Sequence, residues 1–379
     1  MNHYTLKQFD TPLLRFSVKE NTASPVLQIT WINEKKRHLL PLEMEQTAEG
    51  LAYYLKHRVI PSNRAYVHEF LAKCGLHINR PMDIISVSKG LSLNDCYWVT
   101  EEGFDGSFEE YNLYENRFSN ILALIAFTGY GSRVRSSLMS SPEFTTNGML
   151  PKCWRHVGGK VYLYKGGTEG ASNTGCEPYS EFYAKQVADA MGIDAVPYGL
   201  SKWKGVLCST CEIFTSQRYS YLPVGRYLTS GGMAAVDADY RKRGKKFVKA
   251  LGDMLVLDAL ICNTDRHYGN FGYLVDTRKN EIVAPAPLFD HGNSLFNFYG
   301  KYDLDSPEKF AEYADTLMPA AYDDYFGMAG KYLTAEHRSG LRAMTTFRFK
   351  KHSRYNLPDI RLRRIEEQIR LRAQKLLQL

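Results

Sequence analysis

The chain has 379 residues, of which 44% are hydrophobic, and a formal net charge of +7. This length predicts two or three domains, and the moderate charge allows an anionic partner, including nucleic acid, without requiring one. Because the sequence has no run of about 18 apolar residues, no signal-peptide pattern at Met1–Thr5 and seven scattered cysteines, we expect a cytoplasmic protein with reduced thiols and no membrane span.

Residues 1–75 are predicted to form a small α+β unit. Leu13–Val18 and Val26–Trp31 are rich in strand-forming residues, and apolar spacing predicts helices within Met44–His57 and Asn63–Cys74. No pattern of catalytic residues occurs there, so a partner platform and a stabilising appendage both remain open.

Residues 76–137 are predicted to connect this unit to the rest of the chain. We expect Pro81–Ser88 to be extended, Gly90–Val99 to end as a strand, and Tyr111–Tyr130 to be partly helical. Asn94 and Asp95 are typical of a turn rather than of a site.

The segment Ser140–Lys152 contains small and hydroxyl-bearing residues around Gly148. Such a loop lets backbone N–H groups approach phosphate oxygens closely. The Walker pattern is absent, and on its own the segment is more typical of an ordinary turn.

Residues Lys160–Lys165 alternate as a strand does, with Val161, Leu163 and Lys165 on one face. This places an ammonium at the end of an apolar platform, where it can meet nucleotide phosphates. A surface strand is the alternative, and Lys160 is the second candidate for the lysine role.

A helix is predicted from Pro178 to Met191, with Ser180 as its N-cap and Gly192 after its end. Glu181 suits the positive end of the helix dipole, and it can equally pair with Lys165 as a kinase glutamate does. Both explanations remain open.

Val196–Leu200 and Gly205–Cys208 are predicted to be antiparallel strands. The residues after them would link two lobes and meet the adenine edge with their backbone groups. By position alone, this hinge is assigned to Glu212, Ile213 and Phe214.

The segment Asn263–Asn270 follows a predicted buried helix and precedes a predicted strand. Its Asp265 and Asn270 have the D-x-x-x-x-N spacing of a kinase catalytic loop, and Asp290 lies in a later Phe-Asp-x-Gly sequence. ATP-dependent phosphoryl transfer needs this set, with Asp265 as the base and Asn270 and Asp290 as magnesium ligands. Two unrelated turns are the structural alternative. The neighbouring Arg266 and His267 would brace the loop or contact phosphate.

The segment Leu257–Phe271 resembles the catalytic segment of HipA-like serine/threonine kinases, bacterial proteins of which many are toxins of toxin–antitoxin systems. The resemblance extends from about Ser140 to Ser294. In that family a Ser-x-x-Gly stretch, followed four residues later by lysine, covers the nucleotide phosphates, and its serine is autophosphorylated to silence the kinase. The matching residues are Thr145, Thr146, Asn147, Gly148 and Lys152, with threonine where serine is usual.

The resemblance implies an α+β, bilobal kinase-like fold with a mixed β N-lobe, a mainly α-helical C-lobe and an additional N-terminal unit. The expected parts are 1–75, the connector 76–137, the N-lobe 138–226 and the C-lobe 227–379. It also implies ATP and Mg²⁺ as cofactors and a serine or threonine in a protein as acceptor. A translation component such as an aminoacyl-tRNA synthetase would be the target, and an antitoxin a partner.

Two other functions remain open from the sequence. A lipid kinase is one, because phosphoinositide kinases also contain Asp-Arg-His-x-x-Asn. A binding protein built on an inactive kinase scaffold is the other. The last predicted helix, Asp359–Leu379, carries a basic face, which is typical of a solvated surface but also suits RNA or an acidic partner.

Overall fold

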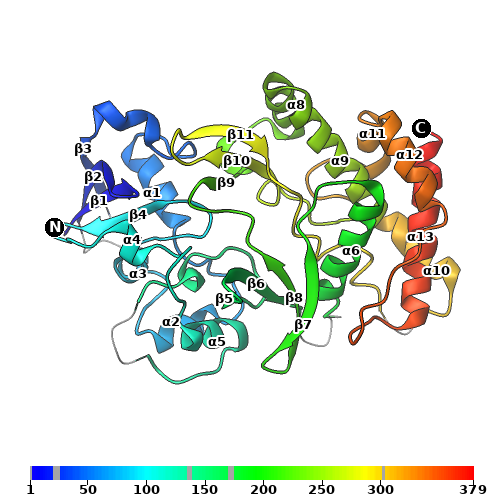
Figure 1. The fold of residues 1–379 in the computed structure, drawn as a ribbon, viewed down its shortest axis with the longest axis horizontal. Coiled ribbons are helices and arrows are strands. Elements are labelled where there is room, and N and C mark those ends of the chain that lie inside the picture. Colours follow the sequence, from blue (N-terminus) through cyan, green and yellow to red (C-terminus); the bar gives the residue numbers. More distant parts are fainter. Residues whose placement is uncertain (1, 20–25, 135–138, 170–174, 301–303) are drawn as a thin grey trace. The chain divides into compact units, whose positions relative to one another are not determined.

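The computed structural model describes residues 2–19, 26–134, 139–169, 175–300 and 304–379. The chain divides into two compact units, which are described separately. Unit 1 comprises Met1–Tyr164, Thr215–Leu222 and Leu274–Val283, and unit 2 comprises Lys165–Phe214, Pro223–Tyr273 and Ala284–Leu379 (Figure 1). Within the described ranges, no helix has the length and apolar character needed to cross a bilayer.

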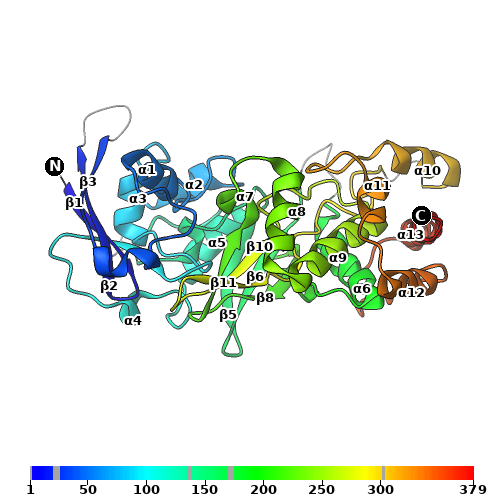
Figure 2. The ribbon, with the colours of Figure 1, turned by 90° about the horizontal axis from the view of Figure 1, so that it is seen from above.

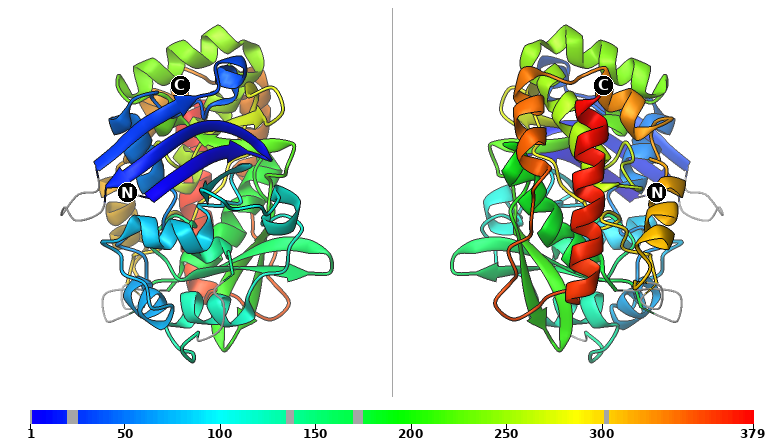
Figure 3. Two further views of the ribbon diagram at one scale, coloured as in Figure 1. Left: turned by 90° about the vertical axis from the view of Figure 1, so that its left-hand side faces the viewer. Right: turned by 90° about the vertical axis from the view of Figure 1, so that its right-hand side faces the viewer.

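Unit 1 begins with a four-stranded sheet in the order β3-β2-β1-β4. The left panel of Figure 3 shows the N-terminal part of this sheet in blue. Its strands are β1 (Asn2–Gln8), β2 (Thr11–Lys19), β3 (Val26–Ile32) and β4 (Tyr97–Glu101). β1 pairs antiparallel with β4, with Leu6 opposite Val99. Residues 1–75 and the segment expected to be a connector therefore share one sheet.

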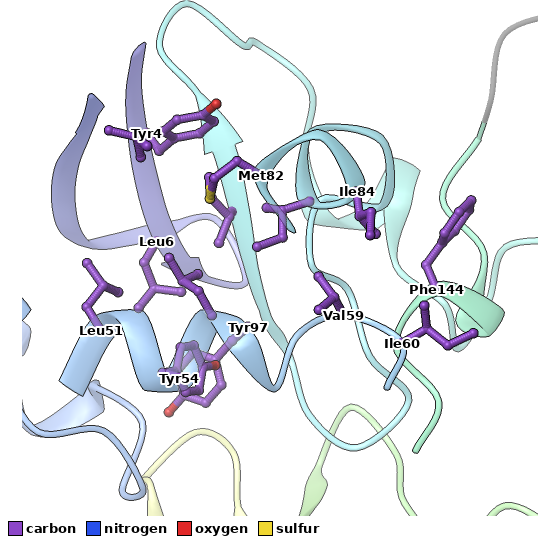
Figure 4. Close-up of a cluster of buried hydrophobic side chains, with 14 of the residues drawn as sticks. Tyr4, Leu6, Leu51, Tyr54, Val59, Ile60, Met82, Ile84, Tyr97 and Phe144 are labelled. Atoms are coloured by element: carbon purple, nitrogen blue, oxygen red, sulfur yellow. The ribbon is translucent and has the colours of Figure 1, made fainter. Parts of the chain in front are cut away.

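Several helices of unit 1 share one apolar core with this sheet (Figure 4). In that core Leu6 of β1, Leu51 of α1 and Ile84 of α3 are almost fully buried. The helices of the unit, including two short 3-10 turns, are η1 (Glu34–Leu39), α1 (Ala48–Lys56), α2 (Val67–Lys73), α3 (Pro81–Ser88), α4 (Phe108–Tyr111), α5 (Asn120–Thr128) and η2 (Pro142–Phe144).

The expectation that Pro81–Ser88 is extended is wrong, because these residues form α3. Pro81 occupies the first turn, where a missing N–H costs nothing, and Asp83 favours the positive end of the helix. Met82, Ile84 and Ile85 are buried, so packing against the core selects the helix.

The remaining strands of unit 1 belong to two further sheets. β5 (Lys152–Val157) and β6 (Lys160–Gly166) are neighbours, and β6 confirms the strand expected at Lys160–Lys165. The other sheet has the order β11-β10-β9, and most of its residues lie in the two later segments of unit 1. Its strands are β9 (Tyr219–Pro223), β10 (Gly272–Asp276) and β11 (Glu281–Pro285).

Unit 2 begins with the last two residues of β6, which lie next to β8. β7 (Tyr198–Trp203) and β8 (Val206–Glu212) pair antiparallel, as expected. α6 (Glu177–Met191) packs on both strands and ends at Gly192, whose φ is 68°. The predicted N-cap is wrong, because α6 begins a turn earlier with Cys176 as its N-cap and Ser180 inside the helix.

Helices make up most of the rest of unit 2. α9, buried over most of its length, contacts α6, α8, α11 and α13 (Figure 2). The right panel of Figure 3 shows α13 in red along the outside of this group. The helices are α7 (Val224–Tyr227), α8 (Gly232–Arg243), α9 (Lys245–Ile261), α10 (Pro307–Thr316), α11 (Tyr325–Gly330), α12 (Ala335–Met344) and α13 (Asp359–Leu377).

Only some of the basic side chains expected on the face of α13 are exposed. Arg361 and Arg372 are both 4% exposed. Arg361 donates to the carbonyl of Tyr299 at 2.9 Å, and Arg372 donates to the carbonyl of Ala259. These two cations hold the helix to its neighbours and are not available to RNA or an acidic partner. All seven cysteines of the chain lie among the described residues, and each is a buried thiol outside any disulfide.

Candidate active site

The segment expected to be catalytic begins where α9 ends. Cys262 adopts a left-handed conformation with φ of 53°, which turns the chain out of the helix. The buried Asn263 then donates to the Asp258 carboxylate at 3.1 Å, and its own oxygen accepts the backbone N–H of Asp265 at 3.1 Å. The helix end therefore fixes the backbone at the position of the predicted base.

The Asp265 carboxylate is oriented by an amide that the sequence patterns did not point to. Asn293 donates from Nδ2 to Oδ2 of Asp265 at 3.0 Å. Asn270 donates from Nδ2 to the backbone oxygen of Asp265 at 3.3 Å, which directs the amide group of Asn270 into the loop. Asp265 is partly exposed, as a base that meets an incoming hydroxyl must be.

Arg266 joins the catalytic loop to the segment that contains Asp290. Its side chain is fully buried and forms a two-point ion pair with Asp258, at 2.9 and 3.0 Å. It also donates to the carbonyls of Asn270 at 3.1 Å and Phe289 at 2.9 Å, and to Nδ1 of His291 at 3.1 Å. Arg266 was expected to brace the loop or to contact phosphate, and its contacts in the structure are those of a residue that braces the loop.

His291 is buried next to this guanidinium. Burial, and then the positive charge of Arg266, lower the pKa of His291 well below its ordinary value. The neutral ring accepts at Nδ1 from Arg266, so Nε2 carries the proton, and that buried atom has no hydrogen-bond partner among the described residues. The ring therefore supports the arginine rather than acting as a proton donor.

Lys165, Glu181 and Asp290 come together in unit 2. The Lys165 ammonium donates to Oε1 of Glu181 at 2.8 Å and to Oδ1 of Asp290. The other oxygen of Glu181 accepts the backbone N–H of His291 at 3.0 Å. The pairing of Glu181 with Lys165, one of two explanations left open by the sequence, is confirmed.

Charge and burial set the protonation of this group. Burial alone would lower the pKa of Lys165, but the Asp290 and Glu181 carboxylates outweigh it and raise the pKa, so the ammonium stays charged. Burial raises the pKa of Glu181, and Lys165 counteracts this rise. A lysine held between two carboxylates is well placed to meet phosphate oxygens.

The backbone at Asp290 is in a conformation that non-glycine residues rarely adopt, with φ of 58°. The Tyr198 hydroxyl accepts the N–H of Asp290 at 3.1 Å, and the ring of the preceding Phe289 packs against Phe214 with centroids 5.4 Å apart. These contacts hold the strained backbone in place. Such strain is found where a side chain must be aimed at a site.

Glu177 is a further acid in this region that the sequence patterns did not single out. It is 1% exposed, and its Oε2 accepts the backbone N–H of Thr168 at 3.1 Å. Its Oε1 is buried and has no hydrogen-bond partner in the part of the chain that the structure describes. A methyl group built on Gly292 would lie 3.4 Å from the Cβ of Glu177 and 3.6 Å from the Lys165 ammonium, so Glu177 lies close to the lysine.

The donors at Asn270 and Asp290 fit a magnesium ion. An amide oxygen and a carboxylate are hard ligands, and Mg²⁺ in nucleotide sites uses one or two protein carboxylates with water and phosphate oxygens as the remaining ligands. Within the described residues, no group of three His, Cys, Asp or Glu side chains is arranged to hold a metal by itself. Both residues would therefore hold the ion only together with phosphate oxygens.

The expected phosphate loop lies in unit 1 and is bound by its own side chains. Thr145 is buried and donates to the carbonyl of Leu91 at 2.7 Å. Thr146 accepts from the indole N–H of Trp154 at 2.9 Å, and Lys152 donates to the carbonyl of Asn147 at 2.8 Å.

Gly148, in the middle of this loop, has φ of 91°, and a Cβ there would lie 2.2 Å from the Lys152 ammonium. The backbone conformation therefore favours glycine, whereas the end of the lysine side chain could move away from a Cβ.

Two buried residues that the sequence patterns missed support this loop. Arg64, from the part of the chain without recognisable chemistry, donates to the carbonyl of Lys152 at 2.5 Å and lies 3.5 Å from that of Thr146. Glu143 accepts the backbone N–H of Trp154 at 3.0 Å and the hydroxyl of Ser141. Long-range contacts of this kind leave no local spacing signal in a sequence.

The other predicted residues are placed as follows. Lys160 is exposed at the start of β6, whereas Lys165 is buried at its end, which favours Lys165 for the lysine role. His267 is exposed, and its Nδ1 accepts the backbone N–H of Gly269 at 3.0 Å, so it braces the loop. The hinge residues Glu212–Phe214 lie at and after the end of β8, and their contact with adenine stays a prediction.

Comparison with known proteins bears on the fold of the chain. No family model matches the chain. It is 26% identical over 136 residues to the serine/threonine-protein kinase CtkA of Helicobacter pylori, a match that covers 32% of this chain and only 41% of that protein's length. The crystal structure of H. pylori CtkA superposes with a TM-score of 0.45 at 15% identity, over 62% of this chain and 90% of that chain.

A second solved structure covers 99% of both chains, with a TM-score of 0.53 and 12% identity. It is the toxin–antitoxin protein HipA of Shewanella oneidensis, in a complex with HipB and operator DNA. The α+β class and the family resemblance seen in the sequence are confirmed at the level of fold. The chain therefore has the kinase-like fold of HipA-like proteins.

Proposed function

We propose that this protein is an ATP- and magnesium-dependent serine/threonine protein kinase of the HipA-like type. The observation that carries the proposal is the ammonium of Lys165 between the carboxylates of Glu181 and Asp290. In protein kinases a lysine–glutamate ion pair and a metal-binding aspartate must both be in place for phosphoryl transfer. Both features occur here in one unit with Asp265 and Asn270.

Each residue has a distinct role in this proposal. Asp265, held by Asn293, accepts the proton of the acceptor hydroxyl. Lys165 contacts the α- and β-phosphates of ATP, and Asn270 and Asp290 supply the metal ligands. Magnesium, when bound, neutralises charge on the phosphates. In unit 1, backbone N–H groups of the Thr145–Gly148 loop would cover the phosphates.

Two other functions are less well supported. An inactive scaffold would not need the buried network of Arg266 to hold Asp265 and Asp290 in relation to each other. A lipid kinase would share that network, so only the identity of the phosphate acceptor distinguishes it from a protein kinase. The serine/threonine kinase CtkA among the relatives favours a protein acceptor.

The partners follow from the HipA relationship. The HipA neighbour is in a complex with HipB from a toxin–antitoxin system. We propose an antitoxin partner for this chain and a toxin role in which it phosphorylates a translation component, such as an aminoacyl-tRNA synthetase. Nucleic acid would be reached through the antitoxin and is not required for phosphoryl transfer.

The test is incubation of the purified chain with γ-labelled ATP and a bacterial lysate, followed by identification of labelled molecules. Label should appear in protein, require magnesium and be absent with Asp265→Asn, whose amide cannot accept a proton. A loss of about 10²–10⁴ in turnover with retained ATP binding is expected for that variant. Label in lipid only would favour the lipid kinase, and no label at all would favour the scaffold.

Asp290→Asn is the second variant in this test. It should weaken ATP binding in the presence of magnesium while leaving magnesium-free binding nearly unchanged, because it removes a metal ligand. A magnesium titration that overlays that of the unaltered protein would show that Asp290 is not a ligand.

A further inference from the structure

A cavity of about 640 Å³ opens in unit 2 where α8 ends, α9 begins and the chain passes from α11 to α12. This volume falls in the range of binding pockets for small ligands or peptide segments. Val248 and Leu333 contribute apolar surface to it, and four cationic side chains line it. These are Arg241, Lys245, Lys249 and Lys331.

The cationic side chains come from a dense basic run. Five of the six residues in Arg241–Lys246 are lysine or arginine. Helix α9 starts within this run, with Lys245 and Lys246 in its first turn, no acidic residue there and no side-chain cap. Lysine is disfavoured at the positive end of a helix dipole. Residues that break such a local preference are expected at functional sites.

The lining contains cations that the fold itself does not neutralise. Arg241 pairs with Asp237 at 2.8 Å, and Lys249 pairs with Asp253 at 3.0 Å. In the part of the chain that the structure describes, Lys245 and Lys331 have no carboxylate within ion-pair distance, and both are exposed. Two positive charges therefore face the cavity, and the N-terminus of α9 adds a partial positive charge.

The cavity is built on rigid elements. His337 at the start of α12 accepts the backbone N–H of Thr334 at Nδ1 and donates from Nε2 to Asp253 of α9 at 2.9 Å, and Thr334 caps α12. Gly252 of α9 lets the chain approach closely, because a Cβ there would lie 3.1 Å from the Cβ of Tyr332. The backbone segments that carry the cationic side chains are therefore held in a fixed arrangement.

We propose that this cavity binds an acidic peptide segment of a protein partner, with an apolar side chain entering between Val248 and Leu333 and carboxylates meeting Lys245 and Lys331. The lining combines apolar surface with separate cations, so it suits a peptide in which an apolar side chain is flanked by carboxylates.

A continuous phosphate backbone fits less well, because Asp237 and Glu336 lie beside the cations. The aromatic residue in the lining, Tyr332, already bonds Asp237 through its hydroxyl, and Arg241 lies over its ring, so it is less suited to stacking with a base.

The test uses the full chain and a fluorescein-labelled octapeptide with two leucines among glutamates, followed by fluorescence anisotropy. Binding should weaken by at least about tenfold in Lys245→Glu/Lys331→Glu. The matched control is Lys242→Glu/Lys246→Glu, which makes the same change of charge on exposed residues outside the lining and should change affinity by less than about twofold.

Replacing the leucines of the probe by serine should also weaken binding by about tenfold, since the apolar surface would then be unused. The proposal is overturned if both double variants lose affinity equally, which means diffuse attraction, or if the octapeptide does not bind. It is also overturned if a labelled single-stranded oligonucleotide binds more tightly than the peptide and is lost in the Lys245→Glu/Lys331→Glu variant.

Discussion

The guanidinium of Arg266 donates to the carbonyl oxygen of Phe289 at 2.9 Å, and this bond links the catalytic loop to the residue before Asp290. The same side chain is neutralised by Asp258, and both side chains are fully buried. The proposed base and the proposed metal ligand Asp290 therefore depend on one buried ion pair for their relative positions.

Arg266→Met should destabilise the protein by about 3–5 kcal/mol, because it leaves the Asp258 carboxylate buried without its partner. Chemical denaturation measures this change. The control is Arg241→Met, which removes an exposed i,i+4 pair with Asp237 and should change stability far less. Equal effects of the two substitutions would mean that the buried pair does not hold the loops.

The local patterns of the sequence predicted the parts of this site that depend on spacing. Asp265 and Asn270 lie in the loop after α9, and Lys165 lies next to the last residue of β6. The local sequence predicts this placement for all three residues. Asn293, Tyr198 and Glu177 act through contacts between distant segments, and nothing in their local sequence indicates this.

Two further expectations are wrong because they, too, depend on contacts between segments that are distant in the sequence. The sequence predicts an extended Pro81–Ser88, but burial of Met82 and Ile84 favours the helix. The basic face of α13 was expected on the surface, but Arg361 and Arg372 are drawn inwards by backbone carbonyls that need donors.

Glu177→Ala should lower ATP affinity by about tenfold, because Thr168, three residues after Lys165, loses the acceptor of its backbone N–H. Stability should not fall in parallel, since the substitution also removes a buried carboxylate oxygen that has no partner. Glu177→Gln should restore part of the affinity, because its amide oxygen can accept from Thr168.

Calorimetric ATP titration and thermal unfolding measure the two effects of Glu177→Ala separately. Asp189→Ala, in an exposed position of the same helix, is the matched control. If affinity and stability fall together in Glu177→Ala, the residue is only structural.

Glu143→Gln should gain stability relative to the unaltered protein as the pH rises. Burial raises the pKa of Glu143 above its ordinary value of 4.5, although bonds from Ser141 and Trp154 oppose this. The folded state therefore holds this proton more tightly than the unfolded state, and stability is lost as the pH rises from about 4.5 through the folded pKa. Glutamine avoids this loss because it carries no charge.

Glu110→Gln is the control for Glu143→Gln, and its pH dependence should have the opposite sign. Hydrogen bonds from Ser107 lower the pKa of Glu110, so its stabilising contribution is present above 4.5 and lost in acid. Denaturation of the three proteins at about pH 3, pH 5 and pH 8 checks both signs, because the effect of Glu110 develops below 4.5 and that of Glu143 above it. If the stability difference between Glu143→Gln and the unaltered protein were the same at about pH 5 and about pH 8, burial would not raise the pKa of Glu143.

The hydroxyl of Thr145 is buried and donates to the carbonyl of Leu91, so phosphorylation there would force the loop to rearrange. A phosphate carries about 1.5 to 2 negative charges and would face a carbonyl oxygen that it can only repel. We therefore expect the modified loop to leave its place and ATP affinity to fall. Thr146, whose hydroxyl bonds Pro142 and Trp154, is the second candidate for modification.

Mass spectrometry after incubation with ATP should find phosphate on Thr145, or secondarily on Thr146, and none in Asp265→Asn. Thr145→Asp should bind ATP at least about tenfold more weakly in calorimetry, while Thr145→Val, which keeps the volume but loses the bond to Leu91, should retain most of the affinity. An unmodified loop in an enzyme that phosphorylates other proteins would rule out self-silencing. Unchanged ATP affinity in Thr145→Asp would mean that this loop does not contact the phosphates.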